Sequence, residues 1–100
     1  MLRLLASNPD IDGVFAANDA MALAAIAAIE ERGKRVPDDI AVVGFDDTLL
    51  SQASRPPLTT VKQDISGLGA AAAESMLQLL NGQQPDSRIL STELIIRESA

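Results

Sequence analysis

Three polar side chains stand directly after predicted strands, where a small ligand could be bound. Asn18, Asp46 and Gln63 each follow a short apolar or β-branched segment. A carboxylate accepts hydrogen bonds from two neighbouring hydroxyls, and an amide both donates and accepts. Because ligands of open parallel sheets bind outside the carboxyl ends of the strands, the three residues together predict a site for a neutral, hydroxyl-rich molecule.

Each of these residues also has a purely structural explanation. Asn18 and Asp19 stand where a helix begins, and either could cap its first turn. Asp46 and Asp47 are typical of a turn after a strand. Gln63 alone indicates nothing. The prediction of a site therefore depends on the coincidence of three strand ends.

The hydropathy pattern places these residues in an alternating order of strands and helices. Strands are expected over 13–17 and 40–45, with a helix from residue 19 to about Arg32 between them and Gly33 at its end. The segment 40–45 is apolar on both faces, as in the interior strand of a parallel sheet. The pattern therefore predicts an α/β fold built on a parallel sheet.

Further elements complete this α/β pattern. They are the end of a helix before Pro9, a helical turn around Leu49–Ala53, a short strand over 58–62, a helix capped by Asp64 and running to about Leu80, and final strand material at 89–90 and 93–97. We expect a single domain over residues 1–100.

The composition removes several classes of chemistry. The chain has 100 residues and contains no histidine and no cysteine, which excludes a Ser-His-Asp triad, a zinc finger and an iron–sulfur site. Its net charge of −6 repels a phosphate backbone, so the chain alone should bind nucleic acid poorly. Asp46, Asp47 and Asp64 could in principle hold Mg²⁺, but no phosphate-cradling loop accompanies them. We expect no catalytic residue, no metal and no cofactor.

The chain shows no membrane-targeting signal. Its longest apolar run, Ala20–Ile29, is shorter than the roughly 20 residues that a membrane span requires. The apolar start at Met1–Ala6 is too short for a secretory signal. We therefore expect a soluble, cytoplasmic protein with no membrane partner.

Five segments resemble the effector-binding core of the lactose/galactose-repressor (LacI/GalR) family of transcription regulators. They are FAANDAMAL at 15–23, Gly33-x-x-Val36-Pro37-x-Asp39-Ile40, VVGFDD at 42–47, PLTTVKQ at 57–63 and RES at 97–99. These motifs follow the family's order and spacing over essentially the whole chain. The resemblance implies part of a flavodoxin-like subdomain of the type I periplasmic-binding-protein fold.

The resemblance also implies which residues contact the effector, usually a sugar or a similar small metabolite. Asn18 and Asp46 match the family's contact positions, Gln63 matches a further contact in sugar-binding relatives, and Phe45 would flank the pocket. The chain would then be the C-terminal portion of the sensor domain. It contains no helix-turn-helix, so operator DNA would be contacted only by such a motif outside residues 1–100.

The helix after Asn18 is apolar over more of its circumference than one contact with a sheet requires. In the resembling family, the face of this helix that points away from the sheet packs against the partner subunit of a homodimer. The resemblance therefore implies a dimer interface at Leu23, Ala24 and Ala27. The alternative is that parts of the same subunit outside residues 1–100 pack against this face of the helix.

Two other functions compete with a regulator's sensor. Part of a periplasmic sugar-binding protein of a transporter would share the Asn18-Asp19 and Gly44-Phe45-Asp46 elements, but it would resemble the PLTT and RES segments less. A small carboxylate-only enzyme would need two carboxyl groups on opposite sides of a bond. Asp46 and Asp47 are adjacent and seldom face each other across a substrate, so we expect no enzyme.

Overall fold

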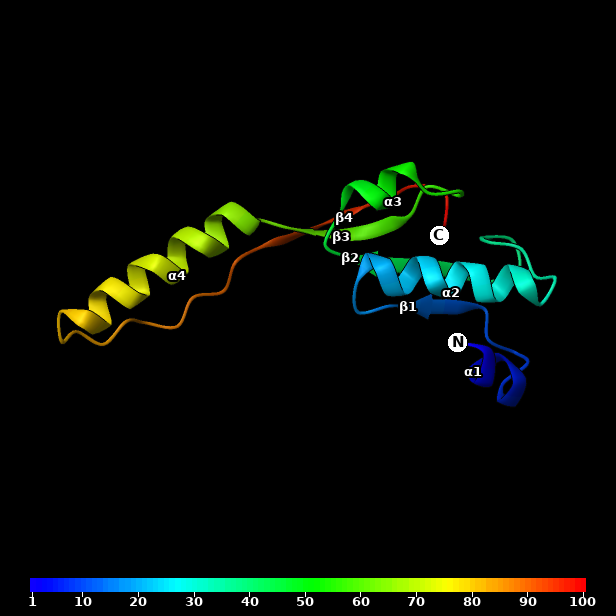
Figure 1. Cartoon of the computed structure of the whole chain (residues 1–100), viewed down its shortest axis with the longest axis horizontal. Coiled ribbons are helices and arrows are strands. Elements are labelled where there is room, and N and C mark those ends of the chain that lie inside the picture. The colour runs from blue at the N-terminus through cyan, green and yellow to red at the C-terminus, as the bar shows by residue number, and fades with distance from the viewer. The chain divides into compact units, whose positions relative to one another are not determined.

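The computed structural model describes all residues, 1–100, and divides them into two compact units (Figure 1). One unit contains residues 1–62 and 93–100, and the other contains residues 63–92. The elements are α1 (Leu2–Ser7), β1 (Gly13–Phe15), α2 (Asp19–Glu31), β2 (Ala41–Phe45), α3 (Leu49–Ala53), β3 (Thr59–Gln63), α4 (Ile65–Leu80) and β4 (Thr92–Ile95).

The four strands form one sheet in the order β1-β2-β3-β4. β2 pairs in parallel with β1 on one side and with β3 on the other. The predicted α/β class with a parallel sheet is confirmed, and so is the interior position of β2. One face of β2 is more covered than the other, because Val42 and Gly44 are buried whereas Ala41, Val43 and Phe45 are half-buried.

The core lies between the sheet and α2, which runs alongside β2 (Figure 1). Alanine and isoleucine side chains of α2 meet the apolar residues of the strands and of the segments that flank them. The buried apolar cluster consists of Leu5, Ala16, Ala22, Ile26, Ile29, Ile40, Val42 and Leu58. Small side chains on α2 let the helix approach the sheet closely, and this close approach shapes the sheet edge described below.

Most predicted boundaries hold to within two residues. The backbone N–H of Ala16 still donates to Val43 beyond the end of β1, at 2.8 Å. Gly33 was predicted at the end of the helix that is α2, and its φ of +72° confirms the left-handed conformation typical of that position. The prediction of strand at 89–90 was wrong. Ile89 is almost fully exposed and lies in irregular backbone before β4, where no strand pairs with it.

The unit of residues 63–92 contains α4. Its predicted cap is confirmed, because Asp64 Oδ1 accepts from the Gly67 N–H at 2.9 Å. The apolar stripe is present at the expected spacing, but no residue of α4 is buried within this chain, and Leu68 and Met76 are at least half exposed. No helix of the structure combines the length and the apolarity needed to cross a bilayer.

A surface ion pair closes the loop before β2 and predicts a small pH dependence. The carboxylate of Asp39 accepts hydrogen bonds from the backbone N–H, Nε and Nη2 of Arg35, at 2.8, 3.1 and 3.1 Å. The Arg35 side chain, and then its backbone N–H, lower the pKa of Asp39 below its ordinary value. Because this pKa is lower in the folded chain, the pair stabilises the fold above the ordinary aspartate range. That stabilisation is lost as the pH falls through the folded pKa.

Replacing this carboxylate should therefore make the stability of the chain depend less on pH between neutral and acidic conditions. We expect Asp39→Asn to reduce the difference between the urea midpoints measured at neutral pH and at about pH 3. Both partners are exposed, so the effect will be small. Asp10→Asn removes another exposed carboxylate and serves as the control. An unchanged difference between the two midpoints in Asp39→Asn would contradict the prediction.

Candidate ligand-binding site

Asn18 caps the first turn of α2. Its Oδ1 accepts from the Met21 N–H at 2.8 Å, and its backbone is extended, with a φ of −156°. The structural explanation of Asn18 is therefore confirmed. Capping uses only the amide oxygen, so the two N–H donors of Nδ2 remain for other partners.

Asp46 and Asp47 follow β2 in an uncommon backbone conformation. Their φ angles are 107° and 52°, in the positive region that residues other than glycine rarely adopt. The Asp46 N–H donates to the Val61 carbonyl at 2.8 Å, which joins this turn to β3. Residues held at such angles cost on the order of 1–3 kcal/mol each and cluster at ligand-binding sites.

Strand register brings two of the predicted contact residues to one edge of the sheet. Phe15 of β1 lies opposite Val43 of β2. Asn18 and Asp46 each stand three residues beyond this pair, and therefore at the same end of two neighbouring parallel strands. Phe45 is half-buried at the end of β2, and its place beside a pocket stays a prediction.

The third predicted residue, Gln63, is half-buried and ends β3. It is also the first residue of the unit 63–92, whereas Asn18 and Asp46 belong to the other unit. Its part in the site stays a prediction from the sequence.

Sequence reasoning missed the role of Asp19, which it considered only as an alternative cap. Asp19 is 1% exposed and its carboxylate accepts three hydrogen bonds. Thr60 Oγ1 donates to Oδ1 at 2.5 Å, and the N–H and Oγ1 of Thr48 donate to Oδ2 at 2.7 and 2.9 Å. The carboxylate thus joins the start of α2 to β3 and to the N-cap of α3. A helix-starting Asp within an otherwise apolar segment was the available signal.

The space around Asp19 exists because residue 44 is glycine. A Cβ added at Gly44 would lie 2.6 Å from Asp19 Oδ1 and 2.9 Å from Leu58 Cδ2. Real Cβ atoms do not approach that closely, so glycine at this point of β2 lets the carboxylate reach Thr60.

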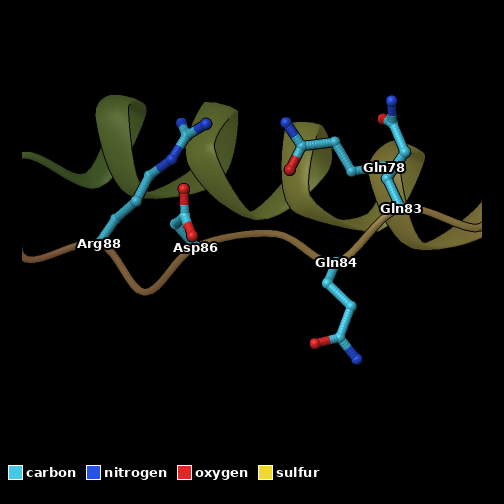
Figure 2. A pocket seen from close by; sticks show the side chains of 5 residues that line it. All are labelled: Gln78, Gln83, Gln84, Asp86 and Arg88. Atoms are coloured by element: carbon cyan, nitrogen blue, oxygen red, sulfur yellow. The ribbon is translucent and has the colours of Figure 1, made fainter.

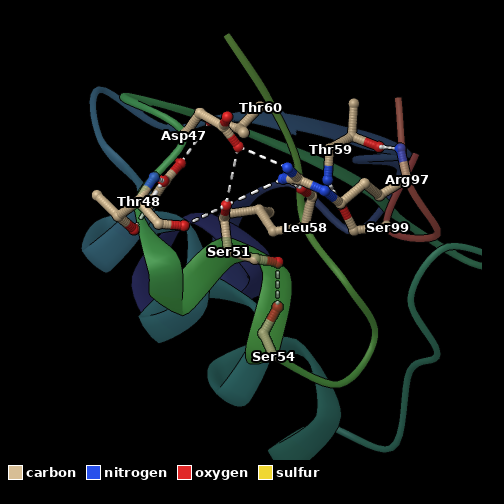
Figure 3. A network of polar contacts seen from close by, with 10 residues as sticks. Asp47, Thr48, Ser51, Ser54, Leu58, Thr59, Thr60, Arg97 and Ser99 are labelled. Carbon is tan, nitrogen blue, oxygen red and sulfur yellow. Dashed lines mark hydrogen bonds and ion pairs between the residues drawn. The ribbon is translucent and has the colours of Figure 1, made fainter. Parts of the chain in front are cut away.

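Sequence reasoning also missed the ion pair between Arg97 and Asp47 (Figure 3). Nη2 of Arg97 lies 2.6 Å from Asp47 Oδ1, and the two side chains are only 17% and 10% exposed. Nη1 donates to the Leu58 carbonyl at 2.8 Å and to Ser51 Oγ at 3.0 Å. The RES motif pointed to this region, but no pattern along the chain indicated that Arg97 pairs with Asp47.

Asp47 and Asp64, which were considered for Mg²⁺ together with Asp46, have partners within the chain. Asp47 is paired with Arg97, and Asp64 caps α4. These contacts give both carboxylates a structural role.

Ser99 connects β2 with β3. Its Oγ donates to the Val42 carbonyl at 2.6 Å and accepts from the Thr59 N–H at 2.8 Å, while its carbonyl accepts from the Val42 N–H at 2.7 Å. The residue is fully buried. Ser99 of the RES motif therefore has a structural role near the amino-terminal ends of β2 and β3.

Comparison with known proteins identifies the kind of domain to which these strand-end residues belong. The model of the periplasmic binding protein-like domain matches residues 1–100. The chain belongs to the periplasmic binding protein-like domain family. Within this family, the chain is similar to transcription regulators, which confirms the resemblance of the five motifs.

Three such regulators are similar to this periplasmic binding protein-like chain. The HTH-type transcriptional regulator CelR of Thermobifida fusca is 41% identical over 101 residues, covering 99% of this chain and 30% of that protein. A solved transcriptional regulator CelR–cellobiose complex has a TM-score of 0.92 at 40% identity, covering 99% of this chain and 31% of that one. A lac repressor dimer bound to operator and the anti-inducer ONPF has a TM-score of 0.87 at 41% identity, covering 98% and 35%. The chain thus spans roughly a third of the length of these proteins.

The surface of α2 in this periplasmic binding protein-like domain includes the residues expected at a dimer interface. Ala24 and Ala27 are exposed, whereas Leu23 is half-buried and packs against the core. A groove of about 890 Å³ runs along the same helix, and its apolar walls come from α1, β1 and α2. Ala24 lines this groove, so a partner that covers it would contact α2.

A smaller, polar hollow of about 290 Å³ lies within residues 63–92 (Figure 2). Gln78, Gln83, Gln84, Asp86 and Arg88 line it. Arg88 reaches towards α4 in Figure 2, and its Nη1 lies 2.6 Å from Glu74 Oε2. No sequence motif pointed to this hollow, and none of its lining residues is a predicted site residue.

Proposed function

We propose that this chain is the effector-sensing part of a cytoplasmic, DNA-binding transcription regulator, and that it binds a sugar or a similar small metabolite. The ligand would be held by Asn18, Asp46 and Gln63, with Phe45 beside it. Operator DNA would be contacted by a helix-turn-helix outside this chain. In this reading the chain binds and signals but catalyses no reaction and takes no cofactor.

One observation carries the proposal. Asp46 is held at a φ of 107° at the same sheet edge as Asn18. A carboxylate there can accept from two adjacent hydroxyls, while the Asn18 amide donates to an oxygen near the start of α2. The similarity to a regulator solved with cellobiose supports a sugar as the ligand. Similarity to regulators also favours this reading over part of a transporter's sugar-binding protein.

The test is the affinity of this chain for cellobiose, measured by calorimetry, before and after Asp46→Ala. We expect a loss of about tenfold to hundredfold, because one charge-assisted hydrogen-bonded group contributes on the order of 1.5–3 kcal/mol. Asp46 is half-buried at a strand end and absent from the core cluster, so the circular dichroism spectrum should not change.

Asp10→Ala is the matched control, because it removes an exposed aspartate far along the chain from Asp46. It should leave the affinity unchanged. Unaltered cellobiose binding by Asp46→Ala would remove Asp46 from the site. Lactose and ribose titrations under the same conditions would then show whether another sugar uses it.

We also propose that the chain forms a homodimer, as the similar lac repressor does, and that α2 lies in its interface. Ala27→Glu places a charge on an exposed position and should shift the chain from dimer to folded monomer in sedimentation. Leu23→Glu should have the same effect with an added loss of stability, because Leu23 also packs against the core. Ala20→Glu is an exposed control at the start of the helix. A dimer that persists in Ala27→Glu would refute the interface.

A further inference from the structure

The turn that carries Asp46 is fixed at three successive residues. The Asp46 N–H donates to Val61, the Asp47 carboxylate pairs with Arg97, and the Thr48 N–H donates to Asp19. Two of these three residues have a positive φ. Such a backbone persists only where its surroundings impose it, so each contact is a candidate for what holds Asp46 in place.

Among these contacts, the one with Arg97 is made by a side chain that is itself held firmly. The backbone N–H of Arg97 donates to Thr59 Oγ1 at 2.9 Å, and Nη1 of its side chain donates to the Leu58 carbonyl and to Ser51 Oγ. The other terminal nitrogen, Nη2, lies against Asp47 Oδ1 (Figure 3). The guanidinium therefore fixes Asp47 relative to the start of β3 and to α3.

We infer that Arg97 is a positioning residue for the ligand site, which acts by holding Asp47 and through it the backbone of Asp46. This inference rests on the proposed function of Asp46. Without Arg97, the Asp47 carboxylate keeps only Ser51 Oγ at 3.4 Å. A poorly exposed carboxylate with so weak a contact turns towards water, and the φ of 52° at Asp47 is then no longer imposed. The contacts of the Asp46 N–H with Val61 and of the Thr48 N–H with Asp19 remain, so the turn loses one of its three fixed points and the direction of Asp46 becomes less constrained.

The contacts also explain why the residue is arginine. A planar guanidinium spans a carboxylate, a hydroxyl and a carbonyl at once, with donors in fixed directions. A lysine ammonium can pair with Asp47, but it cannot reproduce this geometry. Arg97→Lys therefore keeps the positive charge beside Asp47 but removes the hydrogen bonds in fixed directions, so it tests the two effects separately.

The experiment compares the unmodified chain with Arg97→Met, Arg97→Lys and Arg55→Met. Arg55 is exposed and donates to the neighbouring Ser54 carbonyl, so its replacement removes an arginine from the same unit without touching Asp47. Two quantities are measured. One is the affinity for cellobiose, and the other is the strong intraresidue NOE between amide proton and Hα that a positive φ produces at Asp47.

We expect Arg97→Met to weaken cellobiose binding about tenfold and to lose the NOE at Asp47, with several-fold weakening in Arg97→Lys. Arg55→Met should change neither quantity. A folded Arg97→Met variant with unchanged affinity and an unchanged NOE would overturn the inference. If Arg97→Met does not fold, the same two readings on Arg97→Lys decide.

The two readouts also separate this inference from the proposed function. If Asp46→Ala binds cellobiose as well as the unmodified chain, or if the unmodified chain does not bind it, the assignment of the ligand fails. The NOE at Asp47 still answers whether Arg97 holds the turn, because it requires no ligand. An NOE that survives the loss of Arg97 refutes the positioning role in either case.

Discussion

Replacing Asp19 with alanine is expected to lower the free energy of unfolding by about 3 kcal/mol. The substitution removes the acceptor of three hydrogen bonds, one from fully buried Thr60 and two from Thr48. A buried hydroxyl that loses its partner costs on the order of 1–3 kcal/mol, and the space left by the carboxyl group adds to that cost. Urea unfolding followed by circular dichroism measures the change.

Asp19→Asn is the matched control, since it keeps the shape of the side chain. Its amide oxygen can accept from Thr48, and its NH₂ group can donate to Thr60 Oγ1, because a hydroxyl rotates to become the acceptor. We therefore expect the asparagine variant to keep more than half of the stability that alanine loses. Equal losses in both variants would show that the geometry of these contacts is not what stabilises the site.

Gly44→Ala is expected to cost about 2–3 kcal/mol, although it adds a single methyl group. The new Cβ would lie 2.6 Å from Asp19 Oδ1 and 2.9 Å from Leu58 Cδ2. Neither neighbour can move freely, because the carboxylate is held by Thr60 and Leu58 is fully buried. The midpoint of urea unfolding should fall without a change in slope.

Gly13→Ala is the control for this substitution. Gly13 also lies in a strand of the same unit, but a Cβ there meets no atom within 4 Å. Alanine at this position should leave the stability unchanged or raise it slightly, since it reduces the freedom of the unfolded chain. If both alanine variants behaved alike, the close approach at Gly44 would not be the cause of its effect.

Local patterns in the sequence predicted the elements well. The apolar segment 40–45 gave the interior strand, because a strand buried between two parallel neighbours carries apolar residues on both faces. Asp64 was recognised as a cap from its position before an amphipathic stretch, and the hydrogen bond to Gly67 confirms it. The helical turn at Leu49–Ala53 was also predicted with its observed bounds. Each of these signals lies within a few residues of the structure that it specifies.

The polar contacts around the site could not be predicted in the same way. Asp19 meets Thr60 across 41 positions, and Arg97 meets Asp47 across 50. Hydropathy periodicity reports which face of an element is buried, but it does not report which polar side chains meet once the elements pack. Ile89 shows the converse error, since its β-branched side chain favours a strand but no neighbouring strand pairs with it.

The two explanations of Asn18 proved compatible rather than exclusive. Capping and ligand binding were set against each other because both require a polar residue at the start of α2. The structure commits only the amide oxygen to Met21, so the amide nitrogen can still serve a ligand. Asn18 remains a predicted contact residue together with Asp46 and Gln63.

The bonds of Ser99 to β2 also set the time at which the sheet can be completed during synthesis. Val42 lies 57 positions before Ser99, and its carbonyl receives the Ser99 hydroxyl. A ribosome that adds about 5–20 residues per second needs roughly 3 to 11 seconds to make the intervening chain. During that interval, β2 lacks the hydrogen bonds that Ser99 makes to Val42, although it can already pair with β3 once residues 59–63 are made. The hydrogen bonds between Ser99 and Val42 therefore form after the pairing of β1, β2 and β3 has become possible.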